Sequence, residues 1–333
     1  MKISPIVISS RVRYARNLAG IPFPSRLTDP ELALSISKAI FEIFGEEFEF
    51  RQLKNLTQGQ CLMLLERHII SKELISNIDI SSYAVSQDEK ISIMINEEDH
   101  IREQCILPGL NLKACLQQLN LVDDKILEAM DIAYSKNYGF LTSCPTNVGT
   151  GMRASVMLFL PALSISGAMP KVIENAKLAN LTVRGLYGEG SDADGYFYQI
   201  SNKTTLGQSE EDIIKSVEEF VQRIVEMEEK SQKTLITLNK SVILDMCLRA
   251  YGVLTNCYTL GTSECLTLLS KLRFGISCGL IKVKNIDIDE LYYLVQYAHL
   301  ENYYELELNP KERDIFRAKF VGEVLSGKLI KGE

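Results

Sequence analysis

The stretch from Thr142 to Leu160 constrains the fold most strongly, because a glycine-rich loop runs directly into a long apolar segment. Such a segment predicts a buried strand, and the loop before it holds Gly149 and Gly151. Free backbone N–H groups in the loop, together with Arg153 at its exit, would suit a phosphate group, with the thiol of Cys144 beside it. Ordinary turn glycines and a buried cysteine remain the alternative.

A basic motif lies near the start of the chain, where Arg11, Arg13 and Arg16 follow a short strand-like run. In an extended chain, side chains two positions apart project from the same face, so Arg11 and Arg13 are expected to form a cationic pair. A solvated basic surface is the alternative, because exposed arginines are common.

An acidic motif follows a predicted hairpin over residues 83–95, where Glu97, Glu98 and Asp99 stand together and Arg102 comes soon after. Carboxylates at the end of a strand form either a solvated turn or a place where a cation binds or a proton is taken up. His68 lies in the apolar stretch 60–70, where a core histidine and a ligand-binding histidine are both possible readings.

A glycine-rich acidic segment, GEGSDADG at residues 188–195, follows a predicted strand over residues 181–187 that carries Arg184. Its composition is typical of a mobile active-site lid, and it contains Glu189. A plain hairpin loop is the alternative. The aromatic alternation over residues 195–202 predicts that the chain returns as a strand.

Helical periodicity predicts the remaining elements. Asp29 before Pro30 indicates an N-cap and first helical position. Residues 109–136 predict one or two amphipathic helices, with Asp123 and Asp124 as the expected break and cap. Ser209 with Asp212 fits a capping box. In the first two thirds of the chain the predicted helical segments are 29–47, 109–136, 168–180 and 210–232. Strand signals then fade, and the later helical segments are 241–254, 262–274, 287–300 and 310–327.

A length of 333 residues favours two domains, and we place their boundary near residue 235. The net charge of -7 argues against non-specific binding to nucleic acid or to an anionic membrane. Eight scattered cysteines without a C-x-x-C pair, beside only three histidines, argue against a metal site or a disulfide framework. No apolar run approaches a membrane span or a signal peptide, so a reducing cytoplasm is expected.

Arginines dominate the polar residues near the predicted loops, and five of them would suit a nucleoside triphosphate and the charge that spreads in phosphoryl transfer. No Walker A, HRD or DFG motif is present. Paired carboxylates, Glu98 and Glu189, would suit a cationic and delocalised acceptor such as guanidinium. The five arginines are Arg11, Arg13, Arg102, Arg153 and Arg184.

Four motifs occur in order over residues 9–210: SSRVRYARN (9–17), NEEDHIR (96–102), CPTNVGTGMRASV (144–156), and RGLYGEGS (184–191) with QISN (199–202). Together they resemble the ATP:guanidino phosphotransferases, the phosphagen kinase family. The resemblance narrows to the bacterial protein-arginine kinases. The chain begins almost at SSRVR, without the N-terminal helical domain of small-molecule arginine and creatine kinases, and it ends in a helical domain that they lack.

The segment RDIFRA resembles the RDxxRA motif with which the C-terminal domain of protein-arginine kinases senses phosphoarginine. An ordinary charged helix face is the alternative. By this resemblance the allosteric phosphoarginine-binding residues would be Arg313, Asp314, Ile315, Phe316, Arg317 and Ala318.

The resemblance also implies roles at the active site. Glu98 would be the catalytic base, Glu189 the second carboxylate on the guanidinium, and Cys144 a positioning thiolate, with Glu97 behind them. Mg²⁺ would arrive with ATP, bound mainly through phosphates and water rather than by a protein cage. His68 would lie against the adenine. The full set of residues implied to bind the nucleotide is Ser9, Ser10, Arg11, Val12, Arg13, His68, Arg102, Arg153, Ala154, Ser155, Val156, Met157, Arg184, Gly185, Leu186, Tyr187 and Gly188.

The fold implied is α+β. An antiparallel sheet flanked by helices, as in the phosphagen kinase and glutamine synthetase-like catalytic domain, would span residues 1–235, followed by an all-helical domain at 236–333 for dimerisation and phosphoarginine sensing. One departure from the protein-arginine kinases is Phe159, where histidine is common, and it would affect nucleotide packing.

The expected function is phosphorylation of exposed arginines on proteins, in a homodimer. Expected partners are a Clp ATPase or protease, a heat-shock repressor and an activating adaptor, with no direct nucleic acid and no membrane. The alternatives are a free-arginine kinase and a non-catalytic phosphoarginine-binding scaffold.

Overall fold

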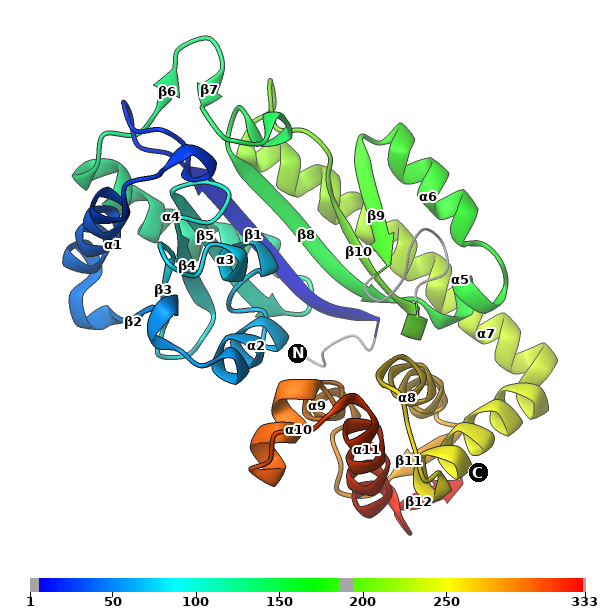
Figure 1. The fold of residues 1–333 in the computed structure, drawn as a ribbon. Coiled ribbons are helices and arrows are strands. Elements are labelled where there is room, and N and C mark those ends of the chain that lie inside the picture. Colours follow the sequence, from blue (N-terminus) through cyan, green and yellow to red (C-terminus); the bar gives the residue numbers. More distant parts are fainter. Residues whose placement is uncertain (1–5, 186–193, 332–333) are drawn as a thin grey trace. The chain divides into compact units, whose positions relative to one another are not determined.

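A computed structural model describes residues 6–185 and 194–331 (Figure 1). Its central feature is an eight-stranded sheet with the strand order β2-β3-β4-β5-β1-β8-β10-β9. The pairs β2–β3, β3–β4, β4–β5 and β1–β5 are antiparallel, as predicted for this fold class. The strands are β1 (Val7–Arg16), β2 (Phe48–Gln52), β3 (Ser82–Ser86), β4 (Ile91–Ile95), β5 (Ile101–Pro108), β8 (Met152–Phe159), β9 (Leu181–Gly185) and β10 (Phe197–Asn202).

Alternating side chains give the sheet two different faces. Ile93 and Ile95 of β4 pack in one cluster with residues of helices α1 (Pro30–Phe44) and α4 (Leu112–Ala129). Met94, between them, belongs to a second cluster with residues of α2 (Gln58–Glu66) and α3 (Lys72–Ser76). Because strand side chains alternate between faces, α1 with α4 and α2 with α3 cover opposite faces of this part of the sheet (Figure 1).

The first helix begins as the sequence predicts. The Asp29 carboxylate accepts the N–H groups of Glu31 and Leu32, and Pro30 occupies the first helical position. The predicted break at Asp123 and Asp124 is wrong, since α4 runs unbroken through both residues. Asp123 faces inward and forms a buried ion pair with Arg16, so its side chain serves the tertiary structure rather than a helix cap.

The next elements follow the prediction only in part, because the helical segment predicted to residue 136 ends earlier, at Ala129. The two short strands β6 (Tyr134–Ser135) and β7 (Gly139–Phe140) pair antiparallel where the sequence suggested the end of a helix. Helices α5 (Pro161–Ile165) and α6 (Met169–Leu178) precede β9. The capping interaction predicted for Ser209 is present, because its hydroxyl accepts the Asp212 N–H at 3.1 Å.

The later part of the chain is mainly helical but not all-helical, which corrects the prediction. Strands β11 (Ile281–Val283) and β12 (Leu329–Lys331) form a small antiparallel sheet. The segment 287–300, predicted as one helix, divides into α9 and α10. The helices here are α7 (Glu210–Asn256), α8 (Thr262–Ser277), α9 (Ile288–Leu294), α10 (Tyr297–Tyr304) and α11 (Pro310–Leu325).

Contacts divide the chain into two compact units. The first comprises residues 1–157, 175–183 and 200–222, and the second comprises 158–174, 184–199 and 223–333. The boundary expected near residue 235 falls inside α7. This helix is interrupted only at Asn239, whose backbone is not helical (φ -135°, ψ 29°). None of the described helices is long and apolar enough to cross a membrane.

Candidate active site

Three of the predicted arginines share one face of the sheet. In the antiparallel register of β1 and β5, Arg13 lies opposite Gln104, and Ala15 lies opposite Arg102. Because alternate residues share a face, Arg11, Arg13 and Arg102 project from the same side of adjacent strands. Two residues that are 91 positions apart in the chain, Arg11 and Arg102, are thereby brought together by strand pairing alone.

The fourth arginine, Arg153 on β8, joins this group electrostatically. Burial, and then the positive charges of Arg102 and Arg153, lower the pKa of Arg11 to about 10. Burial and the charges of Arg11, Arg102 and Arg153 lower the pKa of Arg13 still further. Four neighbouring guanidinium groups, with one carboxylate among them, repel one another and leave a site that favours a polyanion.

Arg13 is the deepest member of this cluster. Its Nε atom is buried and makes no hydrogen bond within the described residues. A buried donor without a partner is costly, and it points to a ligand with acceptor oxygens. A hydrogen bond orients the Arg153 side chain, because its Nη2 donates to the Ser201 hydroxyl on β10 at 3.0 Å.

Glu97 neutralises one of the four arginines. Both of its carboxylate oxygens accept from Arg102 Nη1 at 2.5 Å, and the Ser71 hydroxyl donates to the same carboxylate. Burial alone would raise the pKa of Glu97, but the charge and the hydrogen bonds of Arg102, helped by Ser71, lower it below the usual range. Glu97 is therefore an ionised structural partner, in agreement with the expected supporting role.

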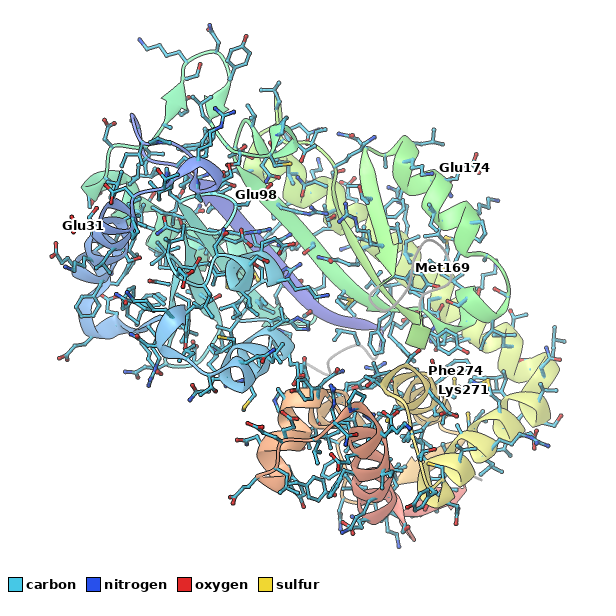
Figure 2. The ribbon with its side chains drawn as sticks, in the orientation of Figure 1. Glu31, Glu98, Met169, Glu174, Lys271 and Phe274 are labelled. Atoms are coloured by element: carbon cyan, nitrogen blue, oxygen red, sulfur yellow. The ribbon has the colours of Figure 1, made fainter. Side chains whose placement is uncertain are left out.

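Glu98, the next residue, has the opposite environment. It is exposed, and partial burial together with the charges of Asp99 and Glu97 raises its pKa, although Arg102 opposes this. A carboxylate that has a raised pKa and forms no ion pair with a described residue is suited to accept a proton. Figure 2 shows Glu98 at the end of the sheet where β4 turns into β5.

Cys144 is linked to this turn through Asp99, which the sequence placed in the acidic motif without a separate role of its own. The Asp99 carboxylate accepts from the Ser143 N–H at 2.7 Å and from Asn17 Nδ2 at 2.6 Å. The Ser143 hydroxyl donates to the Glu98 carbonyl at 2.7 Å. Cys144, partly exposed, thus follows directly after a residue that is bonded to the acidic turn. The only available signal was that Asn17 and Asp99 fall inside the family motifs.

The glycine-rich loop packs closely against neighbouring backbone. A Cβ on Gly151, whose φ is +68°, would lie 2.5 Å from Arg16 Nη1 and 2.7 Å from the Ala15 carbonyl. The N–H of Gly149 donates to the Phe140 carbonyl at 3.4 Å. These glycines allow close packing against β1 and the neighbouring chain, and phosphate binding by the loop stays a prediction.

His68 follows α2 with a left-handed backbone (φ 60°). Desolvation, and then the charge of Arg11, lower the pKa of its imidazole to about 4, although the residue keeps an exposed surface. Its carbonyl accepts from Gln104 Nε2 at 2.6 Å, and Gln104 lies opposite Arg13. The neutral ring therefore stands near the arginine cluster, and its contact with adenine stays a prediction.

Several residues predicted to bind the nucleotide point away from the cluster. Val12, Ala154 and Val156 are fully buried, and the hydroxyl of Ser10 bonds the Gly109 carbonyl at 2.8 Å. Their side chains support the strands that carry the arginines. Side-chain roles for Ser9, Ser155 and Met157 stay predictions.

The role of the last predicted arginine, Arg184, at the nucleotide stays a prediction. Arg184 is exposed on β9 and, with Gly185, belongs to the second unit. The remaining predicted residues of that motif, including one carboxylate, lie outside the described residues: Leu186, Tyr187, Gly188 and Glu189.

The predicted phosphoarginine sensor lies on α11, within the second unit. The guanidinium of Arg313 stacks on the Tyr297 ring at 4.1 Å, and its Nε is buried without a hydrogen bond to any described residue. Arg317 is buried, and it bonds the carbonyls of Leu260 and Val295 and the Asp314 carboxylate at 2.7 to 2.8 Å. Of the two arginines, Arg313 has donor capacity left for a ligand.

The other residues of this motif have mainly packing contacts. The Phe316 ring lies edge-on to Tyr304 at 4.6 Å, Ala318 is buried, and Ile315 is partly buried. The sensing role of the motif stays a prediction.

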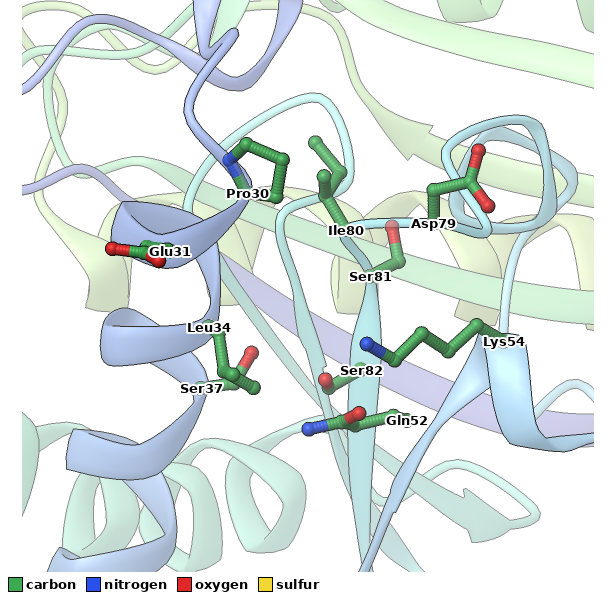
Figure 3. A pocket seen from close by; sticks show the side chains of 10 residues that line it. All are labelled: Pro30, Glu31, Leu34, Ser37, Gln52, Lys54, Asp79, Ile80, Ser81 and Ser82. Carbon is green, nitrogen blue, oxygen red and sulfur yellow. The ribbon is translucent and has the colours of Figure 1, made fainter.

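A separate pocket of about 150 Å³ lies at the start of α1 (Figure 3). Its lining includes Glu31, Lys54 and Asp79, and none of the predicted active-site residues. Among the described residues, no three histidine, cysteine or acidic side chains are grouped to hold a metal ion.

Residues 33–231 match the family model for the ATP:guanido phosphotransferase C-terminal catalytic domain. Residues 240–330 match that for the protein-arginine kinase McsB C-terminal domain. The protein-arginine kinase of Caldanaerobacter subterraneus subsp. tengcongensis is 41% identical over 329 residues, which cover 97% of this chain and 98% of that protein. The chain belongs to the McsB protein-arginine kinases of the ATP:guanido phosphotransferase family.

Other relatives agree with this membership. The McsB-family protein-arginine kinase of Clostridium acetobutylicum is 42% identical over 332 residues, covering 98% of this chain and 97% of its own. Among solved structures, lombricine kinase is similar with a TM-score of 0.58 and 26% identity, over 68% of this chain and 67% of that one. The duplicated taurocyamine kinase of Schistosoma mansoni with bound transition state analog components has a TM-score of 0.60 and 27% identity, over 68% of this chain and 33% of that one. These similarities confirm the predicted fold class.

Proposed function

We propose that this chain transfers the γ-phosphoryl group of ATP to the guanidinium groups of arginine side chains in proteins. The observation that carries the proposal is the group of four neighbouring arginines, three of them on one face of the sheet, with the Glu98 carboxylate beside Arg102. The protein-arginine kinases that cover nearly the whole chain support a protein acceptor.

In this proposal the arginines bind the phosphates and compensate charge as it spreads over the transferred group. The buried Nε of Arg13 would donate directly to a phosphate oxygen. The hydrogen bond to Ser201 would orient Arg153 toward the phosphates. Mg²⁺ would accompany the nucleotide and would supply positive charge at its phosphates.

Glu98 would remove the proton from the attacking guanidinium nitrogen, because a protonated guanidinium is a poor nucleophile. The raised pKa of Glu98 suits this step at neutral pH. Cys144, placed by Ser143 and Asp99, would lie against the acceptor, and Glu189 would be the second carboxylate that fixes its plane.

The wider role proposed is marking proteins for Clp proteolysis and controlling a heat-shock repressor, with an activating adaptor. The family resemblance supports this role. The chain would work as a homodimer in a reducing cytoplasm, where its eight free cysteines would stay unpaired. Phosphoarginine bound near Arg313 would feed back on activity.

The test is incubation of the purified chain with Mg-ATP and an arginine-rich protein, followed by mass spectrometry under non-acidic conditions that preserve the P–N bond. Free arginine serves as a parallel acceptor. Phosphate on protein arginine alone is expected. Transfer to free arginine alone would make the chain a phosphagen-type kinase, and transfer to neither would favour a phosphoarginine-binding scaffold.

A further inference from the structure

The segment Asp194–Phe197 passes helix α8 with no room for a side chain at Gly195. This residue has φ +82°, and a Cβ placed on it would lie 2.9 Å from the Ser270 hydroxyl oxygen of α8. Both residues belong to the second unit. Contact this close means that α8 helps to fix the position of the backbone at Gly195.

Ser270 is itself held in place. Its hydroxyl donates to the Leu266 carbonyl at 2.8 Å and lies 2.8 Å from the Tyr292 hydroxyl on α9. The Tyr292 ring meets the Phe197 ring edge-on, with centroids 5.0 Å apart. Gly195 and Phe197 are therefore both held by α8 and α9, through Ser270 and Tyr292.

Arg273, one turn further along α8, adds a second attachment. Its guanidinium lies 4.4 Å from the centre of the Phe159 ring and forms an ion pair with Asp289 at 2.6 Å. The Phe159 and Phe197 rings are 5.1 Å apart. A neutral aromatic ring attracts the guanidinium face, whereas a protonated histidine at this position would repel it. The ring of Phe159 thus contacts Arg273 of α8, Phe197 of β10 and Tyr196 just before that strand.

Strand β10 starts at this attachment and ends at the candidate phosphate site. Phe197 is its first residue, and Ser201 near its end accepts the hydrogen bond from Arg153. Asn202 accepts from the Ala154 N–H at 2.9 Å and so holds the strand beside Arg153. One short strand therefore carries both the contact with α8 and a contact with a proposed ATP ligand.

We propose that α8 positions strand β10 for phosphoryl transfer, with Ser270 and Arg273 as positioning residues. The proposal rests on the proposed function and concerns the residues from Asp194 onward. It assigns to the helical part of the chain a direct effect on the catalytic rate, through packing at Gly195 and Phe159.

The test is a double-mutant cycle between Gly195→Ala and Ser270→Ala, measured as kcat and as KM for ATP in protein-arginine phosphorylation. Gly195→Ala is expected to lower kcat about tenfold, because misplacement of a catalytic support is costly. Ser270→Ala removes the atom that the new Cβ would meet. In that background the added Gly195→Ala should lower kcat by no more than about threefold. The difference between the two backgrounds is the coupling expected of residues in contact.

Gly279→Ala is the matched control, because Gly279 has φ +71° and open space around it. This variant carries the same backbone strain without the contact and should keep the wild-type kcat. Arg273→Met tests the second attachment, and a fewfold lower kcat with an unchanged melting temperature is expected.

The proposal would be overturned if Gly195→Ala lowered kcat equally in the wild-type and Ser270→Ala backgrounds, or in neither. Should Gly195→Ala fail to fold, Arg273→Met decides, and a wild-type kcat there would overturn the proposal. A wild-type protein that phosphorylates no arginine would instead refute the proposed function.

Discussion

Arg102 binds both carboxylate oxygens of Glu97 with one guanidinium nitrogen, while the adjacent Glu98 forms no ion pair within the described part of the chain. The pKa of Glu97 is lowered and that of Glu98 is raised. Neighbouring acids whose pKa values are pushed apart commonly divide structural and proton-transfer roles. Arg102 therefore assigns the roles of the two glutamates.

Replacing the proposed base should abolish most of the rate without loss of nucleotide binding. For Glu98→Gln we expect kcat to fall about 10² to 10⁴-fold, the usual contribution of a general base. Titration with ATP should give a dissociation constant near that of the wild type. The exposed Glu174→Gln, on α6, is a matched control and should be fully active. A fully active Glu98→Gln would contradict the assignment.

The pH dependence of the reaction should respond to Glu97. Its negative charge contributes to raising the pKa of Glu98, so Glu97→Gln should lower that pKa. The acidic limb of kcat/KM, where Glu98 becomes protonated, should then move to lower pH by up to about one unit. A pH–rate profile of both proteins measures this. Movement of the limb to higher pH would show that another group controls it.

Replacing Arg13 should stabilise the nucleotide-free protein and weaken its binding of ATP. Burial and three neighbouring arginines make its charge unfavourable without ligand. Arg13→Gln is therefore expected to raise the melting temperature of the nucleotide-free protein by a few degrees, about 2 °C per kcal/mol at this size. It should also weaken ATP binding about tenfold or more. Thermal unfolding with and without ATP tests both effects, and a lower melting temperature without ATP would refute the first.

Asp99 should affect the acceptor side of the reaction. Asp99→Ala removes the acceptor for the Ser143 N–H and for Asn17 Nδ2, which releases the loop that leads to Cys144. Loss of these bonds should cost about 1–3 kcal/mol of stability. We expect KM for the protein substrate to rise and KM for ATP to change little. If instead only KM for ATP rises, the loop does not position the acceptor.

A buried acid on the opposite face predicts a pH effect on stability. Burial and the nearby Asp123 raise the pKa of Glu103 well above its usual value, with Arg16 opposing. The folded protein therefore holds a proton that the unfolded chain releases, and this contribution is complete below the unfolded pKa and is lost as pH rises toward the folded pKa. Glu103→Gln should gain stability relative to the wild type between pH 5 and 8 in urea unfolding. A constant difference would disprove the shift.

Local patterns sufficed for much of the fold. The cap at Asp29, the hairpin over 83–95 and most helix positions depend on neighbouring residues and on side-chain periodicity, which a sequence displays directly. The break expected at Asp123 and the helix expected through Tyr134 were wrong. Asp123 is paired with Arg16, which is 107 positions away, and no local rule contains that partner.

The sequence by itself determined which residues could form the site, because the motifs of the family stand in order along the chain. Only the tertiary structure decided what each residue does. Strand register brings Arg102 to Arg13, and an ion pair separates Glu97 from Glu98. Close packing against Arg16 leaves no room for a side chain at Gly151. These roles depend on distances between segments far apart in sequence, which chain folding alone sets.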